Sequence, residues 1–519
     1  MAITVYSVFV PVGDVKLYTA VLLPDSVGTF PVILMRTPYV EQTETQDEEV
    51  ILKDIREERK ELLEAGYAVV LQHCRGTGKS TGDFLPYQDE REDGLALQQW
   101  VREQPFYQKE IYLLGGSYTA YVHYATAPFA PDIKGAILSV MDTERYKTNY
   151  RNGMFCSGLI GAWYVGMYKK RNQLDKCEGA DSFRMLPLSK FTETVLSEKD
   201  VYFDEILKHP DEDDSFWNTS LGGVETRHVM DHVRIPVLMI TGFFDVFLNG
   251  MFKMWRDMDA EAKSKCALII TPYDHSMGWD QPVQFPGANL EEKLPHLEVR
   301  WFEYLRGRGE SPCTCGNVTY YKLFGDSWEC DRFEENVHTR KISLGAGEIA
   351  YVYNPYDPSK YMGGLTTAFS GTAYQLPAGS HYGIKTFYSE AFAEDVYIKG
   401  KITADLCVKS DCEDTCFYMR LSVVKSEGDY GLRDDVHTIS AAAPEYIPGQ
   451  EQMLSFTFDE IAILIHKGEK LRIDVSSSAY PTFVPHTNRK GLFSEQKQAK
   501  IAHNSIVCEK SFITLPCYL

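Results

Sequence analysis

Short runs of consecutive apolar residues alternate with helix-like segments through the first third of the chain. The apolar runs cover residues 31–35, 67–73, 111–114 and 135–140. Helical periodicity covers residues 47–65 and ends at Gly66, a favourable helix C-cap. Because continuous apolar strands separated by helices are buried on both faces, this pattern predicts a parallel sheet with helices on each side. Before it, residues 1–24 predict two strands around a turn at Gly13-Asp14.

The alternation stops near Asp142 and returns after Asp231. Residues 143–231 contain helical stretches, aromatic clusters and charged turns, without a clear buried strand. Two further apolar runs follow, at residues 236–242 and 266–272. We therefore predict one sheet domain built from residues 1–142 and 232–325, with residues 143–231 inserted as a helical cap. Such a cap covers the sheet edge where the strands end and ligands bind.

The pattern changes again after residue 325. All seven tryptophans lie at or before Trp328, and short alternating strands follow at residues 396–408, 416–424 and 470–478. Gly, Pro and Asp turns separate these strands. This alternation predicts that residues 326–519 form a C-terminal β-sandwich.

Composition narrows the function classes. The net charge of −20 argues against nucleic acid or an anionic membrane as the main partner, because phosphate binding needs a positive field. We find no membrane-length apolar run and no export signal, so we expect a cytoplasmic protein. The 12 cysteines are then mostly free thiols. The pairs Cys313/Cys315 and Cys412/Cys416 lack the spacing of a zinc site, so no metal is predicted.

The segment Leu113–Tyr121 carries the clearest catalytic signal. A buried strand leads into Gly115-Gly116-Ser117, and a helix begins just after the serine. Glycines allow the strained turn of a nucleophile elbow, and the amide of Tyr118 can then face a developing oxyanion. A glycine turn with a serine helix cap would give the same local sequence, so this segment alone does not decide the function.

Two later residues complete a catalytic set in the order expected of α/β hydrolases, which is serine, acid, histidine. Asp245 follows the strand at 236–242, and His275 follows the strand at 266–272. Because parallel strands end at the same edge of a sheet, we expect Ser117, Asp245 and His275 to meet there. Each of the last two could singly be an ordinary loop residue, and their coincidence in order and placement favours catalysis.

Two further segments follow predicted strands. Tyr39 ends the strand beginning at residue 31, where its phenol is a candidate second oxyanion donor or simply a packed tyrosine. The glycine-rich loop at residues 75–82 superficially suggests phosphate binding. Only one residue separates Gly76 from Gly78, which is not the spacing of a nucleotide-binding loop. We interpret it as a structural loop near the active site and predict no cofactor.

Together these segments resemble the CocE/NonD hydrolases, which include bacterial cocaine esterase, X-Pro dipeptidyl-peptidases and α-amino acid ester hydrolases. The resemblance spans nearly the whole chain. It rests on the R-x-P-Y strand end at 36–39, the RG-x-G-x-S-x-G loop at 75–82 with Glu90, Asp93 and Trp100 after it, the G-x-S-Y elbow at 115–118, the segments 241–245 and 272–276, and the tail motifs at 353–358 and 477–481. The elbow departs from the family where Ala120 replaces its last glycine.

The resemblance implies an α/β-hydrolase core, a helical cap and a C-terminal jelly roll. It also implies that Tyr39 is an oxyanion donor, and relatives that are often dimers suggest a homodimer by analogy.

We expect Phe244, Phe247, Trp163 and Tyr164 to line an apolar acyl pocket, although the two cap residues could equally be cap core. Three functions remain open. The first is a general esterase or amidase for a small-molecule or peptide-like acyl substrate. The second is a peptidase or amino-ester hydrolase that holds a free amine, for which a cap carboxylate such as Asp175, Glu178 or Asp181 would be required. The third is a catalytically silent binding scaffold.

Overall fold

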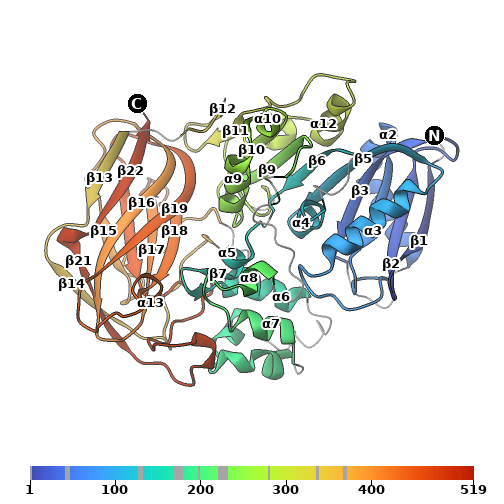
Figure 1. Cartoon of the computed structure of the whole chain (residues 1–519). Coiled ribbons are helices and arrows are strands. Elements are labelled where there is room, and N and C mark those ends of the chain that lie inside the picture. The colour runs from blue at the N-terminus through green and yellow to red at the C-terminus, as the bar shows by residue number, and fades with distance from the viewer. Residues whose placement is uncertain are drawn as a thin grey trace.

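The computed structural model describes residues 3–40, 47–126, 132–141, 143–167, 179–196, 199–219, 229, 232–278, 281–334, 338–365 and 371–518. Within these ranges the chain forms an α/β core, a mainly helical insertion and a C-terminal domain of antiparallel sheets (Figure 1). The insertion lies beside both larger parts, with the core sheet and the C-terminal sheets on either side of it in Figure 1.

The core is a ten-stranded sheet in the order β1-β2-β4-β3-β5-β6-β9-β10-β11-β12. Its pairings from β4 through β3, β5, β6, β9 and β10 to β11 are parallel, whereas β1, β2 and β12 pair antiparallel at the two edges. The strands are β1 (Thr4–Val12), β2 (Val15–Leu23), β3 (Phe30–Thr37), β4 (Ala68–His73), β5 (Tyr107–Gly116), β6 (Ile133–Ser139), β9 (Val237–Phe244), β10 (Ala267–Asp274), β11 (Val318–Lys322) and β12 (Ser327–Asp331).

Helices cover this sheet because its central strands are apolar on both faces. Every residue of β4, β9 and β10 is buried. The predicted helix at 47–65 is divided at Arg59 into α1 and α2, and Asp47 caps its start by accepting from the Glu49 amide. The helices of the core are α1 (Glu48–Glu58), α2 (Lys60–Glu64), α3 (Glu90–Arg102), α4 (Tyr118–Tyr124), α9 (Leu248–Asp257), α10 (Ala260–Lys263), α11 (Leu290–Lys293) and α12 (Leu297–Leu305).

The insertion has its own aromatic core and consists of short helices. Phe155, Phe183, Phe191 and Phe203 pack together there. Its elements are α5 (Arg145–Asn149), β7 (Tyr150–Arg151), β8 (Met154–Phe155), η2 (Ser157–Gly161), α6 (Ala162–Met167), η4 (Gly179–Arg184), η5 (Leu188–Lys190), η6 (Thr192–Leu196), α7 (Val201–Ile206) and α8 (Phe216–Thr219). The small β7–β8 hairpin is the one strand pair described in this helical cap.

The C-terminal domain consists of two antiparallel sheets. One has the order β13-β22-β16-β21-β14 with β19 paired to β16, and the other has the order β15-β20-β17-β18. The elements are β13 (His338–Ser343), β14 (Glu348–Tyr353), β15 (Lys385–Tyr388), β16 (Val396–Ser410), β17 (Cys416–Val424), β18 (Asp429–Thr438), α13 (Ile439–Ala442), β19 (Gln452–Ile465), β20 (Lys470–Ser476), η8 (Phe493–Glu495), β21 (Ala502–Val507), η9 (Cys508–Lys510) and β22 (Phe512–Tyr518).

The boundary between core and C-terminal domain lies later than the predicted residue 325. Strand β12 pairs with β11 and so belongs to the core sheet. The two domains also join through the backbone, because Leu323 bonds to Ala462 at 3.0 Å and to Leu464 at 2.9 Å. Their buried side chains form one continuous hydrophobic cluster. The sequence pattern does not reveal this boundary, because β11 and β12 are short strands that are followed in sequence by the short strands of the C-terminal domain.

Candidate active site

Ser117 lies at a strained turn between β5 and α4. Its φ of 57° is in the left-handed region, which a residue other than glycine adopts only at a cost. The turn is tight because a Cβ at Gly115 would approach the Thr119 carbonyl oxygen to 2.2 Å. The Ser117 amide donates to the Ser139 carbonyl at 2.9 Å, which fixes the turn to β6. This is the geometry of a nucleophile elbow, and Ala120 fits behind it fully buried.

The ends of β5, β9 and β10 bring Ser117, Asp245 and His275 together. His275 Nε2 lies 3.0 Å from Ser117 Oγ, and His275 Nδ1 lies 2.9 Å from Asp245 Oδ1. Asp245 is buried and accepts from the Thr241 hydroxyl at 2.7 Å and the Phe247 amide at 3.3 Å. Because an ionised carboxylate only accepts, Nδ1 carries the imidazole proton and leaves Nε2 free to accept from the serine. The set can therefore pass a proton from Ser117 to His275.

Tyr39 places its phenol beside the nucleophile. Its hydroxyl lies 3.3 Å from Ser117 Oγ and accepts from Trp163 Nε1 at 3.4 Å. The residue as a whole is 45% exposed, but its hydroxyl end is desolvated and this burial raises the pKa of the phenol. Hydrogen bonds with Ser117, Trp163 and the Tyr118 backbone oppose that rise. The phenol is thus protonated at neutral pH and, together with the Tyr118 amide, can donate to an oxyanion beside Ser117.

Of the four predicted pocket residues, Phe247 and Trp163 contact this centre, whereas Tyr164 packs in the core of the cap. The ring of Phe247 meets the His275 imidazole edge to face at 5.2 Å. Trp163 stacks on Tyr118 at 5.5 Å and contacts Tyr164 edge to face at 5.2 Å. The buried Tyr164 also lines a small cavity of about 30 Å³ between the cap and the loop that contains Phe84.

Phe244 departs from the prediction. Its ring packs against Tyr430 at 5.7 Å and against the Arg433 guanidinium at 5.3 Å, so it belongs to the interface with the C-terminal domain. The reason is the alternation of side chains along β9, which turns adjacent residues to opposite faces. Of the predicted amine-binding carboxylates, Asp175 and Glu178 lie outside the described residues, as does the side chain of Asp181.

The C-terminal domain contacts the loop that contains His275 through residues that the sequence analysis did not identify. The Gly371 amide donates to Asp274 Oδ2 at 2.8 Å, and Thr372 Oγ1 donates to Gln281 Oε1 at 2.7 Å. Asp274 immediately precedes His275, so this contact supports the histidine loop. No local signal marks Gly371, because its role depends on a partner almost 100 positions earlier in the chain.

Comparisons with known proteins find relatives along nearly the whole chain. Residues 13–277 match the family model for X-Pro dipeptidyl-peptidase (S15 family), and residues 354–512 match the X-Pro dipeptidyl-peptidase C-terminal non-catalytic domain. The chain is 24% identical over 559 residues to cocaine esterase from Rhodococcus sp. (strain MB1 Bresler), covering 95% of this chain and 93% of the relative.

Solved structures share the whole fold. An α-amino acid ester hydrolase superposes with a TM-score of 0.82 at 17% identity, covering 99% of this chain and 97% of that one. An aminopeptidase from a marine sediment archaeon, Thaumarchaeota archaeon, gives 0.81 at 17% identity over 100% and 96%. A CocE/NonD family hydrolase from Staphylococcus aureus gives 0.67 at 14% identity over 100% and 93%. The core is thus an α/β-hydrolase fold, and the chain belongs to the X-Pro dipeptidyl-peptidase (S15) family of serine hydrolases.

Proposed function

We propose that this protein cleaves acyl esters or amides through an acyl-enzyme formed on Ser117. The observation that carries the proposal is the position of His275, whose ring bridges Ser117 Oγ and the buried carboxylate of Asp245. An unactivated serine is a poor nucleophile, and a positioned base with its own orienting acid makes it reactive. A binding scaffold without catalytic activity would not require these three side chains to meet at a strained turn.

The residues act in a defined order. His275 Nε2 takes the Ser117 proton as Oγ attacks the substrate carbonyl, and Asp245 stabilises the imidazolium that forms. The carbonyl oxygen becomes an oxyanion that accepts from Tyr39 and from the Tyr118 amide. The imidazolium then protonates the leaving alcohol or amine. Water, deprotonated by His275, attacks the acyl-enzyme and releases the acid, and Ser117 regains its proton.

The described aromatic side chains favour a substrate with an apolar acyl group. Phe247 contacts the imidazole and Trp163 bonds to Tyr39, so both rings border the reacting atoms. Apolar walls around a few polar groups suit an apolar acyl group. The relatives include a protein named for cocaine ester cleavage and another named for α-amino acid esters, which supports ester chemistry here.

The second candidate is an X-Pro dipeptidyl-peptidase or amino-ester hydrolase that holds a free amine. The matched family model favours it. A buried ammonium would need a carboxylate partner. Rates on an Xaa-Pro nitroanilide and on a simple nitrophenyl ester separate the two, since faster turnover of the anilide would select the peptidase.

The serine assignment is tested with a fluorophosphonate probe, which labels an activated serine covalently. We expect labelling of the wild type, none of Ser117→Ala, and full labelling of Ser139→Ala. Ser139 is a suitable control because its backbone, not its side chain, holds the Ser117 amide. Undiminished labelling of Ser117→Ala would refute the mechanism.

We further propose that the partner is a free small-molecule or peptide-like substrate and that the protein acts in the cytoplasm. The charge of −20 supports the absence of nucleic-acid and membrane partners. Among the helices described, none has the length and apolar character needed to cross a bilayer. A jelly-roll topology for the two C-terminal sheets and a homodimer remain proposals from family analogy, the latter testable by light scattering.

A further inference from the structure

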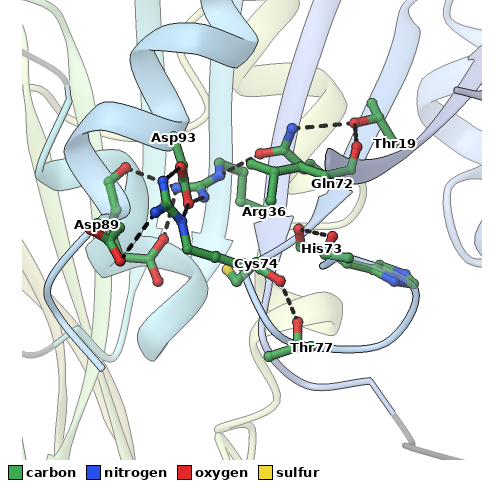
Figure 2. Close-up of polar contacts among 12 residues, drawn as sticks. Thr19, Arg36, Gln72, His73, Cys74, Thr77, Asp89 and Asp93 are labelled. Atoms are coloured by element: carbon green, nitrogen blue, oxygen red, sulfur yellow. Dashed lines mark hydrogen bonds and ion pairs between the residues drawn. The ribbon is translucent and has the colours of Figure 1, made fainter. Parts of the chain in front are cut away.

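Two buried carboxylates lie on helix α3 behind the nucleophile elbow. Glu90 is 4% exposed and Asp93 is fully buried. Buried carboxylates are costly unless they are paired, and both are paired with arginines. Arg36 Nη1 lies 2.8 Å from Glu90 Oε2, and Arg75 Nη2 lies 2.6 Å from Asp93 Oδ1. Figure 2 shows Arg36 between Gln72 on one side and the Asp93 side of this cluster on the other.

Glu90 also holds the side chain of Tyr118. The Tyr118 hydroxyl donates to Glu90 Oε1 at 2.8 Å and accepts from the Tyr87 amide at 2.8 Å. The ring is buried against Tyr87, with centroids 5.1 Å apart. Tyr118 is the first residue of α4 and follows Ser117 directly, so a tether on its side chain fixes the start of the helix and the direction of its backbone amide.

The same glutamate holds the end of β3, the strand that precedes Tyr39. Arg36 is in β3, three residues before Tyr39, and its guanidinium is 1% exposed. Besides the ion pair, Arg36 Nη1 donates to the Glu90 carbonyl at 2.9 Å, and Arg36 Nε donates to Gln72 Oε1 at 2.9 Å. The end of β3 is therefore attached to Glu90 through two contacts of one rigid, planar group.

We propose that Glu90 is a positioning residue that sets the separation of the two oxyanion donors, the Tyr39 hydroxyl and the Tyr118 amide. One carboxylate oxygen meets each donor's segment: Oε1 accepts a hydrogen bond from the Tyr118 hydroxyl, and Oε2 forms an ion pair with Arg36. Glu90 does not touch the substrate. Its effect is expected in the transition state, because only there does the substrate oxygen carry the charge that both donors must meet. This inference rests on the proposed serine-hydrolase function.

The test compares Glu90→Gln with Asp93→Asn. Both changes remove one buried charge from the same helix and from the same arginine cluster, but Asp93 bonds to Arg36 and Arg75 and has no hydrogen bond to Tyr118. With nitrophenyl acetate we expect Glu90→Gln to lower kcat by about 10-fold or more, since a misplacement of ~1 Å costs up to ~10²-fold. KM should change by less than about two-fold. Asp93→Asn should keep kcat near that of the wild type.

A second measurement distinguishes misplaced oxyanion donors from a general loss of order in the active site. A trifluoromethyl ketone forms an oxyanion adduct with Ser117. In Glu90→Gln its inhibition constant should therefore rise by the factor by which kcat falls, and in Asp93→Asn it should stay unchanged. Equal kcat and equal inhibition in the two variants, each corrected for folded enzyme by circular dichroism, would overturn the proposal.

Tyr118→Phe covers the case in which Glu90→Gln fails to fold. It removes only the hydroxyl tether and leaves the pair between Glu90 and Arg36 intact. A kcat loss with unchanged KM supports the proposal, and a wild-type kcat overturns it. Failure of the hydrolase assignment has a different signature, because the wild type itself would then show no turnover and no phosphonate labelling at Ser117.

Discussion

Replacing Tyr39 with Phe removes one donor of the proposed oxyanion hole and little else. The Tyr39 hydroxyl lies 3.3 Å from Ser117 Oγ, and its other side-chain partner within the described residues is Trp163 Nε1 at 3.4 Å. Tyr39 as a whole is 45% exposed, and Phe lacks only the hydroxyl, so the change adds no strain to a packed core. The catalytic histidine keeps both of its bonds. The substitution therefore isolates the contribution of the phenol to the transition state.

The expected loss of kcat depends on the donors that remain in the oxyanion hole. Loss of one oxyanion donor costs ~10²–10³ in kcat, or about 2.7–4 kcal/mol. The Tyr118 amide is retained as the second donor, so part of the oxyanion stabilisation remains. We therefore expect the lower end, a fall in kcat of about 10²-fold with KM nearly unchanged.

Steady-state hydrolysis of a nitrophenyl ester, with thermal unfolding as a check on the fold, measures this effect. Tyr388→Phe is the matched control, because Tyr388 is 50% exposed in the C-terminal domain. We expect that control to match the wild type in kcat and Tm. A fall in kcat of less than about three-fold in a folded Tyr39→Phe enzyme would refute the assignment of the phenol to the oxyanion hole.

Three further predictions concern the acid of the triad, the domain contact and a buried histidine. Asp245→Asn should lower kcat by ~10⁴-fold with an unchanged fold, because the amide favours the wrong imidazole tautomer, and stopped-flow acylation rates check this. Gly371→Val should lower both Tm and kcat, since a Cβ there would lie 2.8 Å from the Phe244 carbonyl and 2.9 Å from Asp274 Cβ; an unchanged kcat would show that the C-terminal contact does not support the triad. Burial lowers the pKa of His123 from 6.5 to about 3. Below about pH 6.5 the histidine is therefore protonated in the unfolded chain but stays neutral in the folded protein. Stability is therefore lost as pH falls from 6.5 toward 3, and His123→Gln should show a shallower fall of Tm in that range.

Local patterns were enough to predict the elements that carry the catalytic side chains. The apolar runs at 31–35, 236–242 and 266–272 correspond to β3, β9 and β10, and the glycines before Ser117 predicted the strained elbow. These predictions succeed because strand burial and positive backbone angles constrain the residue types directly.

Other predictions failed where geometry at longer range decides. Phe244 and Phe247 are both apolar and lie three positions apart, yet one packs against the C-terminal domain and the other against His275. The helix predicted over 47–65 forms, but Arg59 divides it into α1 and α2, although its residues have no strong breaker. The local hydrophobic periodicity of the sequence indicates neither outcome.

The sequence by itself determined which side chains meet at the sheet edge, since Ser117, Asp245 and His275 occur in order after parallel strands, and such strands end at one edge. Only the tertiary structure decided what surrounds and supports them. The tether from Glu90 to Tyr118 and the bond from Gly371 to Asp274 join segments far apart in the chain. The physical reason is that hydrophobic periodicity and turn chemistry report on neighbours within a few residues, whereas these contacts arise from how whole elements pack.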